Sequence, residues 1–419
     1  MKSNLSQIIV VFALLFTLAS CLPAISAPTP SLTLPPVITV VPTPTATESV
    51  IIQTTATPIP PTACLTVAHP LPQDLNMQGK VVLSGVFFDT ASVLMDLSSR
   101  ESTVLRLRKE DETIPDWMFA VSPNRTQLAY GELIDEQHHW LHIITADGKE
   151  QKSLLMDPDW IAFTWLDNSR LLFYEYLKEG RYISPLIVVN PFTEEKQELS
   201  FDYPDLFTFD RLEWGFFSVS RTAYNQTLTK VAYPAAEIEG VFLRIVDVQT
   251  GETLVDMPTN YLVKQPTWSP DAKRLAFIMT VSRGRKMFGL EDIFLIGEDG
   301  QSTQLTHLSE IYTDYLRIDD PIWSPDGEFL AFWLTPSTTY TDRRLAVLDT
   351  SNGNVHEYCS TGDLEVFSDP IWSPDGKYLL IGLSSGERDD LHSIVLIIDS
   401  ATGEVFQIAE DYQPKGWLK

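Results

Sequence analysis

Short apolar runs separated by polar turns recur along most of this chain. In one of them, an apolar stretch ends at Trp323, the turn Ser324–Gly327 follows, and residues 329–333 then read Phe-Leu-Ala-Phe-Trp. Proline presets φ at the second turn position, Asp bonds to its own backbone, and Gly tolerates positive φ, so the turn favours a tight reversal. The flanking aromatic and aliphatic residues favour strands. The pattern predicts an all-β chain.

The amino-acid sequence around this turn is repeated. Residues 320–327 and 369–376 both read Asp-Pro-Ile-Trp-Ser-Pro-Asp-Gly, and residues 265–272 read Gln-Pro-Thr-Trp-Ser-Pro-Asp-Ala. Each unit continues into a third strand with an acidic end, such as 345–349, and a short fourth strand, such as 405–408. Four-stranded units that recur about every 50 residues are typical of β-propeller blades.

Weaker copies extend the repeat towards the N-terminus. The anchor positions are 121, 165, 219, 268, 323, 372 and 417. Seven anchors predict seven blades, with six or eight as alternatives because the copies before residue 260 are degenerate. No strand follows Trp417, whereas the strands expected at 80–84, 92–97 and 103–107 lack a first strand. An unpartnered inner strand would be an unsatisfied edge, so we predict that the two chain ends pair and close the ring.

The repeat also resembles a known family. Trp-Ser-Pro-Asp-Gly followed by a Leu-Ala-Phe type of strand is similar to the WD40-like (PD40) propeller repeat of TolB-type proteins, over roughly residues 78–419. No α/β domain precedes the propeller, so the resemblance does not extend to TolB itself. Propellers of prolyl-oligopeptidase-like enzymes share the repeat, but the chain has no Gly-x-Ser-x-Gly nucleophile motif.

The N-terminus has the features of a bacterial lipoprotein signal. Lys2 precedes an apolar run at 8–18, and Leu-Ala-Ser-Cys at 18–21 resembles the lipoprotein box, in which Cys21 becomes lipidated. An ordinary secretory signal cleaved near Ala27 is the alternative. The predicted organisation is a signal peptide at 1–20, a lipidated Cys21 with a Pro/Thr-rich disordered stalk at 21–74, and a propeller at 75–419. We expect an exported protein, anchored by lipid to the outer face of a bacterial membrane.

Three cysteines are few for an exported chain. If Cys21 carries lipid, then Cys64 at the end of the stalk and Cys359 in the sixth blade remain. A disulfide between them would join the stalk to the ring in an oxidising compartment. Two unrelated thiols are the alternative, because a disulfide requires a geometry that sequence does not define.

The formal net charge is −26. Such an acidic surface argues against nucleic acid and against direct docking on anionic lipids, which both require basic patches. We therefore expect no nucleic-acid partner, and membrane contact through the lipid anchor only. Basic partners or cations are more natural, although a generally solvated acidic surface explains the charge equally well.

The candidate binding residues lie on the innermost strands, which line the channel of a propeller. Asp320 and Asp369 each precede a proline that opens such a strand, and Gln265 occupies the matching position one blade earlier. Two carboxylates and an amide at one channel mouth could accept a cation, or a Lys or Arg of a partner. The alternative is that each Asp caps a local turn. We assign Asp271, Asp326 and Asp375 to their turns.

Other candidates are weaker. A basic loop containing Arg283, Arg285 and Lys286 is a candidate contact for an acidic partner or a glycan, or simply a solvated hairpin tip. The aromatic and acidic loop 202–213 suits sugar or peptide recognition, or packing onto its own blade. His138, His139 and His142 do not form a three-histidine zinc set, because a strand places 139 on the other face. We predict no metal, no cofactor and no catalytic residue.

The function expected from these features is a tethered propeller that binds a protein, peptide or glycan without catalysis. One alternative is an envelope hydrolase or lyase with carboxylates near the channel, and another is a scaffold subunit of an envelope complex. We expect a monomer, because a closed ring leaves no free sheet edge to recruit a second copy.

Overall fold

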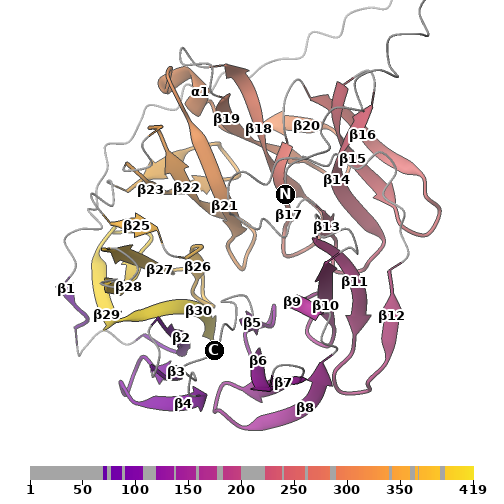
Figure 1. Ribbon diagram of the computed structural model, residues 1–419. Helices are drawn as coiled ribbons and strands as arrows, with labels where there is room; N and C mark the ends of the chain where they lie inside the picture. The colour runs from indigo at the N-terminus through magenta and orange to yellow at the C-terminus, as the bar shows by residue number, and fades with distance from the viewer. Residues whose placement is uncertain are drawn as a thin grey trace, which may run out of the picture. The chain divides into compact units, whose positions relative to one another are not determined.

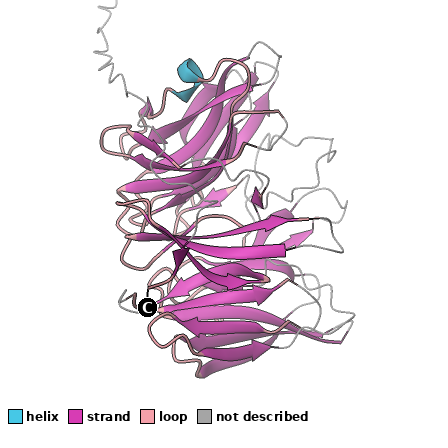
Figure 2. Cartoon of the chain, turned by 90° about the vertical axis from the view of Figure 1, so that its left-hand side faces the viewer, coloured by secondary structure: helices cyan, strands magenta, loops and turns pink. Residues whose placement is uncertain are grey.

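The computed structural model describes residues 69–72, 77–86, 90–106, 119–135, 138–156, 160–176, 183–199, 222–237, 240–259, 263–283, 289–338, 342–358, 364–366, 368–386 and 392–419. These residues form seven β-sheets arranged as a ring (Figure 1). The prediction of a seven-bladed propeller is therefore confirmed. Figure 2 shows the blades edge-on, with almost all of the described secondary structure in strands.

The first three blades come from the N-terminal half and the last strand of the chain. From the ring's centre outwards, blade 1 contains β30 (Tyr412–Leu418), β2 (Lys80–Gly85), β3 (Ser92–Asp96) and β4 (Ser102–Arg106). Blade 2 contains β5 (Phe119–Val121), β6 (Gln127–Asp135), β7 (His138–Thr145) and β8 (Glu150–Met156). Blade 3 contains β9 (Trp160–Trp165), β10 (Leu171–Tyr176), β11 (Ile183–Val189) and β12 (Lys196–Glu198).

The next three blades repeat this order. Blade 4 contains β13 (Ala223–Tyr224), β14 (Lys230–Glu237), β15 (Gly240–Asp247) and β16 (Thr253–Thr259). Blade 5 contains β17 (Val263–Trp268), β18 (Leu275–Arg283), β19 (Gly289–Ile296) and β20 (Ser302–Gln304). Blade 6 contains β21 (Arg317–Trp323), β22 (Phe329–Thr335), β23 (Arg344–Asp349) and β24 (Val355–Glu357).

Blade 7 departs from the four-strand pattern in two ways. Its innermost strand is interrupted, because β25 (Glu365–Val366) and β26 (Ile371–Trp372) both pair with β27 (Tyr378–Ser385). Outside β27 lie β28 (His392–Asp399) and β29 (Val405–Glu410), and β1 (His69–Pro70) adds a parallel strand on the outer edge of β29. The first propeller strand therefore lies within the segment that the sequence assigned to the stalk.

The repeated turn forms as its residue types predict. In blade 6 the Ser324 hydroxyl donates to Asp326 Oδ1 at 2.5 Å and accepts from the Phe329 amide at 2.9 Å, while Gly327 has φ 76°. The same Ser–Asp hydrogen bond holds Asp271 at 2.5 Å and Asp375 at 2.7 Å. These aspartates therefore belong to their turns, as expected.

The tryptophan before each turn joins neighbouring blades. The indole N–H of Trp323 donates to the Thr267 carbonyl of blade 5 at 3.1 Å, and that of Trp372 donates to the Ile322 carbonyl of blade 6 at 3.1 Å. The hydrophobic clusters likewise span adjacent blades; one combines Trp333 and Leu345 of blade 6 with residues of blade 7. The core therefore lies between blades, and burying these apolar faces stabilises the ring.

The two ends of the chain close the ring as predicted. Strand β30 pairs antiparallel with β2, with Trp417 opposite Val81 and Leu418 opposite Lys80. One short helix, α1 (Leu308–Ile311), occurs among the described residues, and it belongs to the connection from blade 5 to blade 6. Within the described ranges no helix is long and apolar enough to cross a bilayer. Cys21, Cys64 and Cys359 lie outside the described residues.

Candidate functional site

The innermost strands bend at the residue that precedes each proline. Strand β17 has a register shift between Lys264 and Thr267, and β21 has one between Asp319 and Ile322. A bulge of this kind turns a side chain away from the regular alternation of a strand. Asp320 lies in its bulge with φ 55°, a left-handed conformation that Asp tolerates better than most residues. Blade 7 has its interruption at the equivalent position, where Asp369 lies.

The structure brings Asp320 and Asp369 together. Their side chains are hydrogen-bonded to each other, and a bond between two carboxyl groups requires one of them to carry a proton. Burial among protein atoms raises the pKa of Asp369 above its ordinary value, and the nearby Asp319 adds to this effect. Lys415, Arg343 and the hydrogen bond from Asp320 act in the opposite direction without cancelling it. The pair therefore favours holding one proton.

A third carboxylate, Asp319, is surrounded by cations. The distances to its carboxylate oxygens are 2.7 Å from Arg317 Nε, 3.4 Å from Arg343 Nη2 and 3.7 Å from Lys264 Nζ. The side chain of Asp319 is only 7% exposed, so these ion pairs are poorly screened by water. Lys264 also bridges to Glu291 of β19, at 2.9 Å. This arrangement fixes the basic side chains beside the aspartate pair.

Asp369 lines a cavity of about 490 Å³. The lining comes from the innermost strands of blades 1, 2, 6 and 7 and from residues next to them, and it includes Phe119, Arg125, Asp369, Trp372 and Lys415. Asp369 is exposed to this space although protein atoms surround it on most sides. The cavity therefore lies in the central channel, and it combines apolar walls with both signs of charge.

The sequence did not predict two residues that line this cavity, Gln413 and Lys415. Gln413-Pro414 repeats the residue-proline pair of the other inner strands, but one extra residue separates it from Trp417. Strand β30 absorbs this residue in a register shift, and Lys415 donates to Gln413 Oε1 at 2.5 Å. The Gln-Pro dipeptide is the signal for this position, although it lies one residue further from its tryptophan than the Asp-Pro dipeptides of blades 6 and 7 do.

The remaining candidates do not join this site. Gln265 lies at the predicted register position in β17, but its side chain is outside the described residues, as are Arg285, Lys286 and the loop 202–213. Arg283 is the last residue of β18, opposite Gly289. On blade 2, His142 lies between the carboxylates of Glu132 at 3.0 Å and Glu150 at 3.1 Å, so it is held in a hydrogen-bonded position.

The chemistry available in the channel is that of paired carboxyls beside fixed cations. No group of three or more His, Cys, Asp or Glu side chains able to hold a metal occurs in the part of the chain that the structure describes. A carboxyl pair that shares a proton can exchange it for another positive group, such as an ammonium. Carboxyls with displaced pKa values also occur in acid–base catalysis.

Comparison with known proteins adds to the fold only. No protein-family model matches the chain, and no curated protein matches it. An uncharacterized protein from Listeria monocytogenes EGD-e is similar in structure, with a TM-score of 0.50 and 12% identity over 83% of this chain and 93% of that one.

Two other solved structures resemble the chain with lower scores. TolB from Acinetobacter baumannii has a TM-score of 0.42 and 14% identity over 85% of this chain and 88% of its own. An oligogalacturonate lyase in complex with manganese has a TM-score of 0.49 and 15% identity over 79% of this chain and 86% of its own. These two likenesses carry no argument about this chain, so the ligand has to be argued from the site.

Proposed function

We propose that this protein is a non-catalytic binding module that takes a positively charged group of a protein, peptide or glycan into its central channel. The observation that carries the proposal is the contact between Asp320 and Asp369 at a cavity of about 490 Å³. Pockets of roughly 300–1,000 Å³ with a few convergent polar groups are the usual size for ligand sites. An ammonium or guanidinium group of the ligand would replace the proton shared by the two carboxyls.

The surroundings of the pair support recognition of a larger molecule than a bare cation. Lys415 and Gln413 lie beside Asp369 and offer an ammonium and an amide to acceptor atoms of the ligand. Phe119, Trp372 and Pro370 provide apolar contact on the same cavity. A ligand with one cationic group and neighbouring acceptors, such as a lysine-containing peptide or an amino sugar, fits this combination.

Calorimetric titration with tri-lysine and with glucosamine tests the proposal. Asp369→Asn should weaken binding by about 10-fold or more, because a charge-assisted hydrogen bond contributes roughly 1.5–3 kcal/mol. Affinity should rise with pH through the titration of Asp369, since the ligand competes with the shared proton. Asp326→Asn, in an exposed turn, is the matched control. Unchanged affinity in Asp369→Asn would remove the channel pair as the site.

The raised pKa of Asp369 favours a second candidate, an envelope hydrolase or lyase that uses this pair as acid and base. Incubation of the protein with envelope polysaccharides and peptides separates the two functions. Turnover that disappears in both Asp320→Asn and Asp369→Asn would establish catalysis, whereas binding without turnover supports the module. A scaffold role is the third candidate, and crosslinked pull-down from membranes would recover its partner proteins.

We further propose that the module is a monomer displayed outside the cytoplasm on a lipidated Cys21. What supports this is the Leu-Ala-Ser-Cys box followed by a proline-rich segment. Cys21→Ser should release the protein from the detergent phase in which a lipoprotein partitions. Retention of that variant with the membrane would contradict the anchor, and a stable dimer in sedimentation would contradict the monomer.

A further inference from the structure

The turns between first and second strands contact one another from blade to blade. The backbone amide of Asn124 in blade 2 donates to Asn168 Oδ1 in blade 3, at 2.8 Å. Arg170 of blade 3 donates through Nη2 to the Gln226 carbonyl of blade 4, at 3.1 Å. Because alternate strands run in opposite directions, all of these turns lie on one face of the ring.

The best-formed turns pack glycine onto proline. A methyl group placed on Gly327 of blade 6 would lie 3.5 Å from Pro270 Cδ of blade 5. A methyl group on Gly376 of blade 7 would lie 3.8 Å from Pro325 Cδ of blade 6. Arg274 of blade 5 also holds the turn of blade 6, because it donates to the Gly327 carbonyl at 2.6 Å. We call this line of contact between two adjacent blades a seam. Each turn therefore covers the proline of the turn before it.

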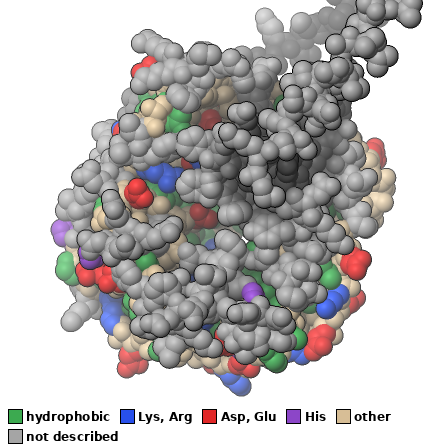
Figure 3. Space-filling view, in the orientation of Figure 1, with side chains coloured by type: hydrophobic (Ala, Val, Ile, Leu, Met, Phe, Trp, Pro, Cys, Tyr) green, Lys and Arg blue, Asp and Glu red, His purple; other side chains and the backbone are tan. Residues whose placement is uncertain are grey.

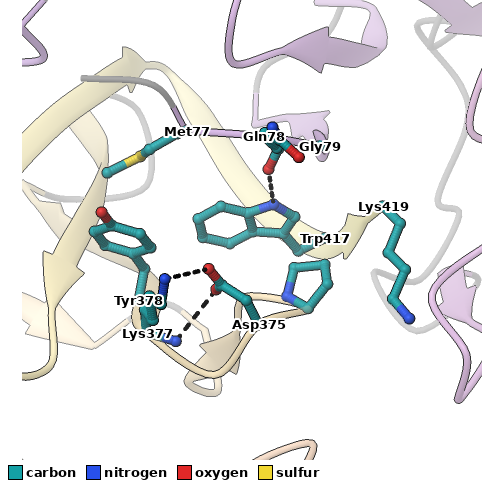
Figure 4. Close-up of a pocket in the computed structure, with 9 residues that line it drawn as sticks. Met77, Gln78, Gly79, Asp375, Lys377, Tyr378, Trp417 and Lys419 are labelled. Atoms are coloured by element: carbon teal, nitrogen blue, oxygen red, sulfur yellow. Dashed lines mark hydrogen bonds and ion pairs between the residues drawn. The ribbon is translucent and has the colours of Figure 1, made fainter. Parts of the chain in front are cut away.

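Between blades 7 and 1, the described residues provide no such turn. Blade 1 takes its first strand from one end of the chain and its second strand from the other, so no residues connect β30 to β2 on this face. A cavity of about 510 Å³ lies there instead. Its lining combines the uncovered turn of blade 7 with the two chain segments of blade 1: Met77, Gln78, Gly79, Pro374, Asp375, Lys377, Tyr378, Trp417 and Lys419 (Figure 4).

The wall of this cavity keeps the geometry of the filled seams. Tyr378 stacks on Trp417 with ring centroids 6.4 Å apart, as Phe329 packs on Trp372 at 6.4 Å in the seam before it. Tyr378 follows its turn at the position that Arg274 occupies in blade 5. In the part of the chain that the structure describes, the Tyr378 hydroxyl has no hydrogen-bond partner, so this donor is unused.

From this geometry we infer that the open seam is a docking site for a reverse turn of a partner protein, of the Pro-Asp-Gly kind that fills the other seams. The glycine of the partner's turn would cover Pro374, and one of its carbonyls would accept from the Tyr378 hydroxyl. Lys377 and Lys419 line the cavity and complement the aspartate of such a turn, although Lys377 also lies 3.7 Å from Asp375. This site is separate from the channel pair.

A cyclic peptide that holds Ser-Pro-Asp-Gly in a turn is the probe, titrated into the full-length chain and followed by NMR and tryptophan fluorescence. We expect saturable binding that perturbs Trp417. Tyr378→Phe should weaken it by about 2- to 12-fold, the loss of one hydrogen bond. Blade 6 carries phenylalanine at this position, so the variant should fold normally. A peptide with valine in place of glycine should bind less, because valine disfavours the positive φ of Gly327 and Gly376.

Two controls keep the outcomes distinct. Phe329→Tyr adds the same hydroxyl to a filled seam and should create no binding. Asp369→Asn should leave binding of the peptide unchanged, so failure here and failure of the channel proposal can be told apart. The inference is overturned if the cyclic peptide does not bind at millimolar concentration, or if Tyr378→Phe has no effect. Concentration-dependent dimerisation that Tyr378→Phe abolishes would overturn it too, by assigning the seam to a second copy.

Discussion

At the scale of single residues, the channel site depends on where a strand departs from regularity. Asp320 and Asp369 occupy the same position in two copies of an eight-residue motif, which is why the sequence predicted that they would lie close together. The bulge that turns Asp320 into the left-handed region could not be read from the same residues, because Asp-Pro is compatible with several backbone geometries. The sequence did not predict the position of Lys415, because β30 has one extra residue between Pro414 and Trp417.

The raised pKa of Asp369 should be visible in the dependence of stability on pH. The pKa of Asp369 in the folded state is raised above its ordinary value of 3.8. Between that value and the folded pKa, the folded state therefore binds more protons than the unfolded state. The contribution of Asp369 to stability is therefore complete below the unfolded pKa and is lost as pH rises through the folded pKa. Asp369→Asn should raise the unfolding free energy near pH 7 by roughly 0.5–1.5 kcal/mol, since its amide can donate to Asp320 at every pH while water screens this exposed side chain.

Thermal unfolding from pH 4 to pH 8 measures this effect. The difference between variant and parent should be small in acid and should grow with pH, which separates Asp369 from the carboxylates whose pKa values are lowered, such as Asp96 and Asp167. Those groups lose their contribution as pH falls. A variant that is less stable than the parent at pH 7 would show that Asp369 is held as an anion by its cations.

At the scale of the secondary-structure element, blades 3, 5, 6 and 7 each contact the preceding blade through the tryptophan that ends their first strand. The indole N–H bonds of Trp165 and Trp268 reach the inner strands of the preceding blades at 2.9 and 3.0 Å, as those of Trp323 and Trp372 do. The sequence predicted strand, turn and strand from local residue types. It could not predict this bond, because the partner carbonyl lies about one repeat away and carries no side-chain signal.

Replacement of one tryptophan should therefore destabilise two blades. Trp372→Phe leaves the Ile322 carbonyl without its donor in a buried seam, and it removes volume from a side chain that is 1% exposed. We expect a loss of about 2–4 kcal/mol, the sum of an unsatisfied buried carbonyl and a small cavity. Urea denaturation measures it. Trp140→Phe in β7, where no indole hydrogen bond is found among the described residues, should cost much less.

At the scale of the whole molecule, joining the two chain ends completes the ring but leaves one seam different from the rest. Trp417 illustrates this: its indole donates to the Gln78 carbonyl at 3.3 Å, within its own blade, and not to the inner strand of blade 7. The sequence predicted that the two chain ends would pair, because the first blade lacked an inner strand. It did not predict the cavity beside them, which lies where the other blades have a turn between their first two strands. Figure 3 shows acidic and basic side chains close together along the rim of the described part of the molecule.

Gly79 offers a direct test of how much the closure contributes to stability. It has φ 99°, and a methyl group at this position would lie 2.2 Å from the Leu418 carbonyl oxygen on the closing strand. Gly251 has φ 71° and nothing within 4 Å of the same methyl position, so it shares the backbone strain without the contact. We expect Gly251→Ala to cost about 1–2 kcal/mol. Gly79→Ala should cost roughly 1–3 kcal/mol more, because the backbone of β30 must move away from β2. Urea midpoints of the two variants provide the comparison. Equal midpoints would mean that the last strand tolerates displacement, and that the ring's stability resides in the other six seams.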